Sequence, residues 1–242
     1  MKEEKVRFVR SLFFPAFFVT LMWMVKTIEH LTEFSFMHLG IFPRTAKGLV
    51  GVLFSPFIHG DWMHLFNNSL PIIILGTVLF YFYRPIAYKV FFLIFFIANI
   101  WLWALGRPAY HIGASGIVYG LAAFVFFSGI IRWHIPLMVL SLLVTFLYGS
   151  LVWGIFPISH RVSFEGHLTG SIAGMILAYI YRKEGPQRKK YEWQQENDEE
   201  DDIPDDENAY WRKIQPEEHK NENNTSPGQS QGDVHYHYKP LE

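Results

Sequence analysis

The amino-acid sequence predicts an all-α polytopic membrane protein, a bundle of six transmembrane helices followed by a disordered cytoplasmic tail. Three observations support this fold class. Half of the 242 residues are hydrophobic and 18% are aromatic. Apolar runs of helix length recur along residues 11–182, and a soluble bundle built from them would have no face for water. Charge is segregated, with 13 Lys/Arg and 6 Asp/Glu in residues 1–182 against 8 and 16 in residues 183–242.

Six apolar runs are long enough to cross a bilayer, since a helix of about 20 residues spans a hydrocarbon core of about 30 Å. They occupy residues 11–31, 63–83, 86–105, 115–131, 135–156 and 164–181. The first follows a basic start but has no small-residue cleavage site before Lys26, so it is interpreted as an uncleaved anchor helix. The expected organisation is a cytoplasmic segment over residues 1–10 and a membrane domain over residues 11–182.

Lysine and arginine set the expected orientation, because they concentrate on the cytoplasmic side of membrane proteins. With the N-terminus in the cytoplasm, twelve of these residues lie inside and four outside. The four outside are Arg44, Lys47, Arg107 and Arg161. Both termini are then cytoplasmic, as six spans require.

The segment 183–242 is poor in apolar residues and contains the acidic run 196–207. Such a composition cannot bury enough surface to offset the entropy of ordering, so a disordered acidic cytoplasmic tail is predicted. A solvated tail and a regulatory or partner-binding tail both remain open.

Four polar residues stand out within the predicted spans, and polar groups inside a membrane indicate function. They are His64, Asn68, Ser115 and His167. Asn68, Ser115 and His167 each precede, by 15 to 17 residues, an arginine at the cytoplasmic end of the same helix. At about 1.5 Å per residue, the three are expected at one depth, in the outer part of the bilayer.

Ser115 lies in the sequence Gly-Ala-Ser-Gly at the start of a helix, where backbone N–H groups are unpaired and suit a developing oxyanion. A serine hydroxyl needs a base, and His167 supplies an imidazole at matching depth. His64 and Asn68 are four residues apart, so they share a helical face and could both donate to the oxyanion. Because no carboxylate is placed to orient His167, a Ser/His dyad is predicted.

Small residues favour close approach of the helices that carry Ser115 and His167. The glycine pairs are Gly116 with Gly120 and Gly170 with Gly174. Tyr119 is one turn from Ser115, so its ring could pack against the imidazole.

Three segments together resemble the rhomboid intramembrane serine proteases. They are HGDWMHLFNN at residues 59–68, GASGIVYG at 113–120 and GHLTGSIAG at 166–174. The resemblance covers the whole six-helix body and implies a rhomboid-like bundle of the compact bacterial form, located in the bacterial cytoplasmic (inner) membrane. It implies a serine endopeptidase that cleaves transmembrane segments of membrane proteins near the outer face of the bilayer, without a cofactor.

The same resemblance assigns roles to individual residues. Ser115 is the expected nucleophile and His167 the general base, while His64 and Asn68 line the oxyanion hole and Tyr119 stacks on His167. The expected packing glycines are Gly113, Gly116, Gly120, Gly170 and Gly174. Two departures from the family pattern are the absence of a Trp-Arg pair in residues 32–61 and the presence of Gly166 where alanine is common.

Other function classes receive less support. A non-proteolytic rhomboid-like protein that binds membrane helices is the main alternative, but such proteins commonly lose a member of the dyad. A metal site of His59, His64 and His167 lacks the usual spacing and carboxylates. The absence of cysteine excludes a thiol nucleophile. The sequence has no basic stripe of the kind that binds nucleic acids. The expected partners are transmembrane protein substrates and membrane lipid, with no metal and with the oligomeric state open.

Overall fold

The computed structural model of the chain describes residues 2–147, 154, 156 and 163–186. The long helices are α1 (Lys2–Thr32), α3 (Trp62–Phe82), α4 (Ala87–Leu105), α5 (Ser115–Ile131), α6 (Ile135–Leu147) and α8 (Phe164–Ile180). The segment between α1 and α3 holds η1 (Phe36–Leu39), η2 (Lys47–Val50), α2 (Gly51–Phe54) and η3 (Ser55–Phe57). The described ranges contain an isolated bridge between Ile41 and His111 but no strand. The predicted helical fold class is confirmed.

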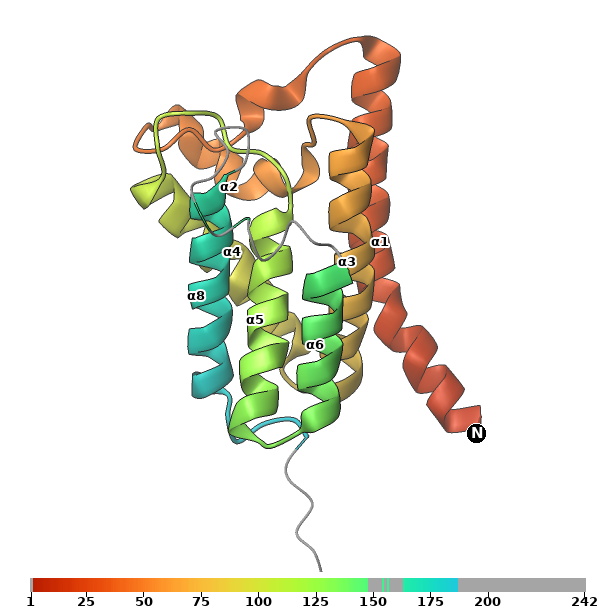
Figure 1. The fold of residues 1–242 in the computed structure, drawn as a ribbon. Coiled ribbons are helices and arrows are strands. Elements are labelled where there is room, and N and C mark those ends of the chain that lie inside the picture. The colour runs from red at the N-terminus through yellow and green to blue at the C-terminus, as the bar shows by residue number, and fades with distance from the viewer. Residues whose placement is uncertain (1, 148–153, 155, 157–162, 187–242) are drawn as a thin grey trace, which may run out of the picture. The chain divides into compact units, whose positions relative to one another are not determined.

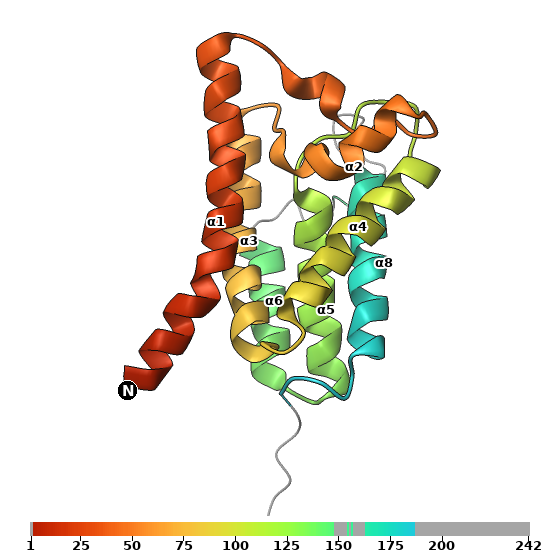
Figure 2. The same ribbon diagram turned by 180° about the vertical axis from the view of Figure 1, so that it is seen from behind.

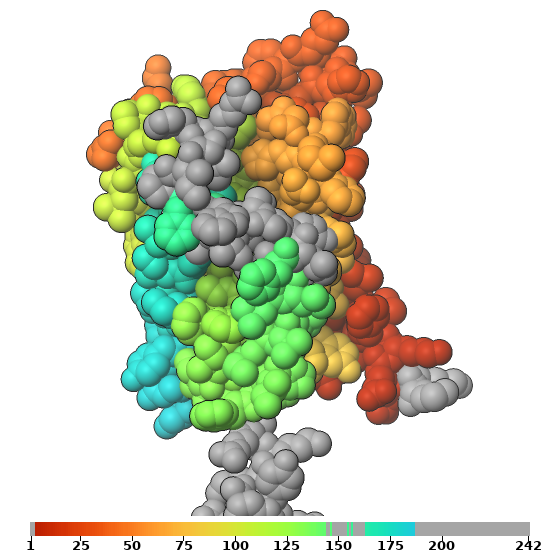
Figure 3. Space-filling view, in the orientation of Figure 1, coloured from red at the N-terminus to blue at the C-terminus, as the bar shows by residue number. Residues whose placement is uncertain are grey.

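The helices form a bundle around α5 (Figure 1). Helix α5 packs most extensively against α8 and also contacts α3, α4 and α6. In the space-filling view of Figure 3, α5 is visible only as a strip between α8 and α6. Its side chains Ile117, Leu121 and Phe124 are almost completely buried, so the helix that begins with Ser115 is the least exposed to the surroundings.

The segment between α1 and α3 folds over one end of the bundle (Figures 1 and 2). Backbone hydrogen bonds attach it to the helices: Ile41 and His111 exchange two, of 2.9 and 2.8 Å, and Gly113 N–H donates to the Ser55 carbonyl at 2.9 Å. The indole of Trp103 on α4 donates to the carbonyl of Thr45 at 2.9 Å. These contacts fix the loop that leads into α5.

The exterior of the bundle is apolar along its length. Phe13, Val139 and Tyr179, on three different helices, are each more than half exposed. Three helices, Glu3–Thr32, Trp62–Phe82 and Ala87–Leu105, are long and apolar enough to cross a membrane, and α5 adds a shorter apolar helix of 17 residues. Exposed apolar surface on this scale requires a lipid solvent, so the chain is an integral membrane protein.

The helices do not coincide with the apolar runs at every end. Helix α1 begins at Lys2 and so includes most of the segment 1–10 that precedes the apolar run, because the charged side chains in its first turns are good helix formers and do not interrupt the backbone ladder. Gly154 and Phe156 are not helical, so the fifth predicted run does not reach residue 156. The predicted tail begins with turns over residues 183–186, and its remainder, from residue 187, lies outside the described residues.

Candidate active site

Helices α5 and α8 touch through their backbones at two pairs of glycines. A Cβ atom on Gly170 would overlap the carbonyl oxygen of Gly116 and lie 2.9 Å from its carbonyl carbon. A Cβ atom on Gly174 would likewise overlap the carbonyl oxygen of Gly120. Side chains at these positions would hold the helices apart, so the glycines permit the close approach on which the candidate site depends.

Ser115 is the first residue of α5 and follows a sharp turn. Gly113 has φ +102°, a left-handed conformation that glycine adopts without strain. Ala114 is the N-cap residue. The N–H groups of Ser115 and Gly116 therefore lie in the first turn of α5, where a helix offers them no acceptor. The fold thus presents a hydroxyl beside backbone donors that have no acceptor within α5.

His167 lies in the second turn of α8 and contacts Ser115 directly. Its Nε2 is 2.8 Å from Ser115 Oγ, and its Nδ1 is 2.8 Å from the carbonyl oxygen of Gly154. A carbonyl oxygen can only accept, so Nδ1 donates and carries the proton of the neutral ring. Nε2 is then the acceptor, and the Ser115 hydroxyl donates to it. This tautomer is the one that a general base for Ser115 requires.

The ring of Tyr119 stacks on His167. The ring centroids are 4.0 Å apart and the planes are inclined by 11°. Tyr119 is one turn after Ser115 on α5, and both aromatic side chains are buried. The stacked ring and the Gly154 carbonyl together restrict the orientation of the imidazole.

His64 and Asn68 approach the turn that precedes Ser115. Asp61 caps α3 by accepting from His64 N–H at 2.7 Å. A Cβ atom on Gly113 would lie 2.7 Å from His64 Nε2 and 3.8 Å from Asn68 Nδ2, so both side chains face this turn. Gly113 therefore lies against side chains of α3 and is not part of the glycine contact between α5 and α8. Asn68 Nδ2 donates one hydrogen bond, at 2.9 Å, to the His64 carbonyl, and an amide nitrogen has a second N–H to give.

The sequence did not reveal the acceptor for His167 Nδ1. That acceptor is the Gly154 carbonyl, and a backbone acceptor has no side-chain signature. Glu165, which lies two residues from His167, is instead 3.7 Å from the Arg107 guanidinium. Within the described residues, the base is thus oriented by a backbone carbonyl.

A second feature missed in the sequence is the contact between His111 and Ser163. Nδ1 of His111 is 2.7 Å from Ser163 Oγ, and its Nε2 is 3.1 Å from the Arg107 carbonyl. Burial lowers the pKa of His111, which favours the neutral ring that accepts from Ser163 and donates to Arg107. Ser163 is the N-cap of α8, so this bond links the loop before Ser115 to the helix that carries His167. The sequence signal for this contact is that His111 lies four residues before Ser115 and Ser163 lies four residues before His167.

His59 is buried behind this group. It is 1% exposed, and burial lowers the pKa of His59 to about 3. Its ring centroid is 5.0 Å from that of His64, and its backbone carbonyl accepts from Lys26 at 2.9 Å. No group of three or more His, Asp or Glu in the described part of the chain is arranged to hold a metal ion. His59 therefore packs against His64 in the structure.

Comparison with known proteins finds one family and several relatives. A family model described as Rhomboid domain matches residues 46–184. An uncharacterized protein of Mycobacterium tuberculosis (strain ATCC 25618 / H37Rv) is 33% identical over 184 residues, which cover 71% of this chain and 75% of the relative. An uncharacterized protein of Mycobacterium bovis gives the same values. One of Mycobacterium leprae (strain TN) is 32% identical over 190 residues, or 71% of either chain.

Proposed function

Because the chain belongs to the rhomboid family, whose members are generally intramembrane serine proteases, we propose that it is a serine endopeptidase that cleaves transmembrane segments of other membrane proteins. The observation that carries the proposal is the 2.8 Å contact between Ser115 Oγ and His167 Nε2. The acceptor role of Nε2 follows from the Gly154 carbonyl on Nδ1. An activated serine of this kind is the nucleophile of serine hydrolases.

The first chemical step forms an acyl-enzyme. Ser115 Oγ attacks the carbonyl carbon of the scissile peptide bond while its proton passes to His167 Nε2. The tetrahedral intermediate collapses as the imidazolium returns this proton to the leaving amine, and the C–N bond breaks. In the second step His167 takes a proton from water, the resulting hydroxide attacks the ester, and Ser115 Oγ leaves with the proton. The products are a carboxylate and an amine.

The negative charge of the tetrahedral intermediate needs donors near Ser115. The backbone N–H of Ser115 and the second N–H of Asn68 are the proposed donors, with His64 beside them at the Gly113 turn. Donors held in place before the reaction lower the barrier because little reorganisation accompanies the charge. The Gly154 carbonyl stabilises the imidazolium by accepting from Nδ1, which is the part a carboxylate plays in a triad.

The site lies close to one membrane surface in this proposal. Ser115 is the first residue of α5 and His167 the fourth of α8, and the end of the bundle that bears Arg132 and Arg182 is opposite. Because lysine and arginine concentrate at that opposite end, it is assigned to the cytoplasm together with both termini. Cleavage then takes place near the outer face, and we propose the bacterial cytoplasmic membrane as the location. The protease domain extends over residues 11–182 and the cytoplasmic tail over 183–242.

A fluorophosphonate probe tests the proposal, since it reacts only with an activated serine. The full chain in detergent should be labelled covalently, and peptide mass spectrometry should place the adduct on Ser115. Ser115→Ala should lose the label, whereas Ser128→Ala, which changes a buried serine on the same helix far from His167, should keep it. Equal labelling of the wild type and Ser115→Ala, or no labelling of a folded wild type, would contradict the dyad. The second result would favour a protein that binds membrane helices without cutting them.

A further inference from the structure

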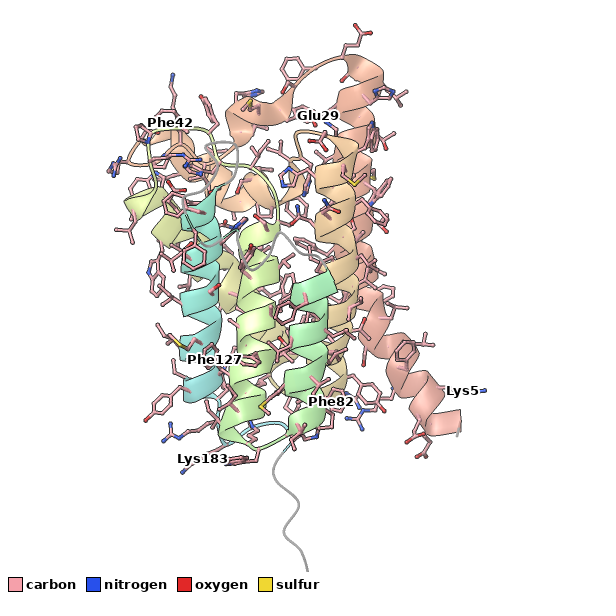
Figure 4. The ribbon with its side chains drawn as sticks, in the orientation of Figure 1. Lys5, Glu29, Phe42, Phe82, Phe127 and Lys183 are labelled. Atoms are coloured by element: carbon pink, nitrogen blue, oxygen red, sulfur yellow. The ribbon has the colours of Figure 1, made fainter. Side chains whose placement is uncertain are left out.

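A cavity of about 620 Å³ opens at the end of the bundle opposite Ser115. It lies between the first turns of α1 and the connection from α3 to α4. Its lining includes Glu3, Arg7, Arg10, Phe80, Arg84 and Tyr88. Lys5 and Phe82, neighbours of these residues in the sequence, lie at the same end as Lys183 in Figure 4, and Glu29 and Phe42 lie at the other end. The cavity is therefore separate from the candidate active site.

The bend of α1 forms one wall of the cavity. The first part of α1 departs from the bundle (Figures 1 and 2), and the helix contains Pro15, which cannot donate to the backbone ladder. An aromatic cluster lies at the base of the cavity. Phe14 is 5.0 Å from Phe80 and 5.1 Å from Tyr88, and Phe80 is 4.7 Å from Tyr88, between ring centroids. The floor of the cavity is thus apolar and the rim is charged.

Three arginines and one glutamate line the rim. Arg7 is fixed, since its Nη2 donates to the Tyr81 carbonyl at 2.7 Å and its guanidinium lies 4.4 Å from the centroid of the Tyr81 ring. Arg10 and Arg84 make no hydrogen bond or ion pair with the described part of the chain, and both are exposed. Glu3 offsets one of the three positive charges. Two guanidinium groups therefore face the cavity without an anion.

Guanidinium groups match phosphate oxygens in a bidentate geometry. Basic pockets between membrane helices bind phospholipid headgroups, and tyrosines such as Tyr81 and Tyr88 are enriched at the depth of those headgroups. A cavity with a cationic rim and an aromatic floor suits a ligand that carries a phosphate above acyl chains. A soluble phosphate would leave the floor of Phe80 and Tyr88 without a partner.

We propose that this cavity is a binding site for an anionic phospholipid. Arg10 and Arg84 bind the phosphate, Arg7 stands beside them, and Phe80 and Tyr88 contact the glycerol and the first methylene groups. The bound lipid joins the bent start of α1 to the α3–α4 connection. This site goes beyond the proposed peptidase activity, because none of its residues belongs to the dyad or its supports.

The test compares thermal unfolding of the full chain in a neutral detergent with added phosphatidylglycerol, phosphatidylcholine or inorganic phosphate. A ligand that binds the folded state raises Tm with its concentration. Phosphatidylglycerol should raise Tm, and phosphatidylcholine and inorganic phosphate should do so far less. In the double variant Arg10→Gln/Arg84→Gln, the concentration for half of the Tm shift should rise about tenfold or more, because each hydrogen bond between charged groups contributes about that factor.

The matched control is Arg182→Gln/Lys183→Gln, which removes two positive charges at the same end of the bundle but outside the cavity. It should keep the response of the wild type. An equal loss in both double variants would show attraction to the general positive charge and would overturn the site. A full shift with inorganic phosphate would overturn the lipid as the ligand. If Arg10→Gln/Arg84→Gln fails to fold, native mass spectrometry of the single variant Arg84→Gln replaces it, with Arg84→Lys as the charge-conserving control. Arg84→Gln should retain less bound phosphatidylglycerol than the wild type, and Arg84→Lys should retain more than Arg84→Gln. A wild-type level of bound phosphatidylglycerol in folded Arg84→Gln would contradict the proposal.

Discussion

Replacing Gly170 with alanine is expected to separate Ser115 from His167. The new Cβ atom would lie 2.9 Å from the carbonyl carbon of Gly116 and 3.2 Å from its α-carbon, besides overlapping its carbonyl oxygen. Non-bonded carbon atoms prefer a separation of about 3.5 Å or more. The two helices must therefore move apart by about 0.6 Å or more, because both contacts are with backbone and no side chain can rotate away.

This displacement has a measurable consequence for catalysis. Ser115 and His167 lie on the two helices that separate, so the distance from Ser115 Oγ to His167 Nε2, now 2.8 Å, would lengthen beyond the range of a good hydrogen bond to a hydroxyl. A misplacement of about 1 Å at a reacting centre can lower the rate about 10²-fold. We expect kcat/KM of Gly170→Ala to fall by about this factor. Overpacking should also lower the free energy of unfolding by about 1–3 kcal/mol.

The assay is the rate of cleavage of a transmembrane reporter in proteoliposomes, normalised to folded protein, together with the rate of fluorophosphonate labelling. Gly166→Ala is the matched control on the same helix. Its Cβ would lie 3.1 Å from Ser163 Oγ and 3.2 Å from a methyl group of Leu102, so it meets only side-chain atoms, which need to give way by a few tenths of an ångström. It should stay within a few-fold of the wild type. Wild-type cleavage and labelling by folded Gly170→Ala would refute the link between helix separation and the dyad.

Four further predictions follow from the same contacts. Ser115→Ala and His167→Ala should each abolish cleavage, and the double variant should lose little more, because the two residues act as a unit; additive losses would contradict a dyad. Asn68→Ala should lower kcat by about 10²–10³-fold with a small change in KM, as expected for an oxyanion donor. Steady-state kinetics that show unchanged turnover, together with a lower Tm, would instead indicate a purely structural role. Acidification from pH 7 to pH 5 should destabilise the protein, because the folded state holds the pKa of His59 at about 3 against 6.5 for the free side chain. Below pH 6.5 the unfolded chain therefore binds more protons than the folded chain, and the free energy of unfolding falls by about 1.4 kcal/mol for each pH unit of acidification. His59→Gln should flatten the dependence of Tm on pH. Arg132→Ala should lower the free energy of unfolding by about 2–5 kcal/mol, since the buried guanidinium hydrogen-bonds the carbonyls of Tyr181 and Glu184; a Tm equal to that of the wild type would contradict this.

The helices were predictable because a bilayer leaves few alternatives for a long apolar run. The starts of α3, α5 and α8 fall within one residue of the predicted positions. The apolar pattern begins at residue 11, whereas the backbone ladder of α1 begins at Lys2 and passes through the charged turns. Hydropathy predicts which part of a helix contacts lipid, but it does not predict the residue at which the backbone hydrogen bonds begin.

The candidate site was predictable only in part. Ser115, His167 and Tyr119 come from two helices, and their approach followed from the glycine spacing that lets backbones touch. The Gly154 carbonyl on His167 Nδ1 and the bond between His111 and Ser163 were missed. The first uses a backbone atom that every residue has, and the second joins two loops 52 residues apart. Contacts of that kind depend on how the helices are placed, which the local sequence does not encode.

Cleavage of a transmembrane substrate by the purified protein tests the central claim most directly. The full chain would be reconstituted in liposomes with a set of single-span reporter proteins, and the products would be identified by mass spectrometry. The proposed mechanism predicts cleavage at a peptide bond within or beside the membrane segment, on the side where α5 and α8 begin, by the wild type and not by Ser115→Ala. Identical products from wild-type and Ser115→Ala protein, or persistent absence of cleavage by a wild-type protein whose Ser115 does not react with fluorophosphonate, would contradict it.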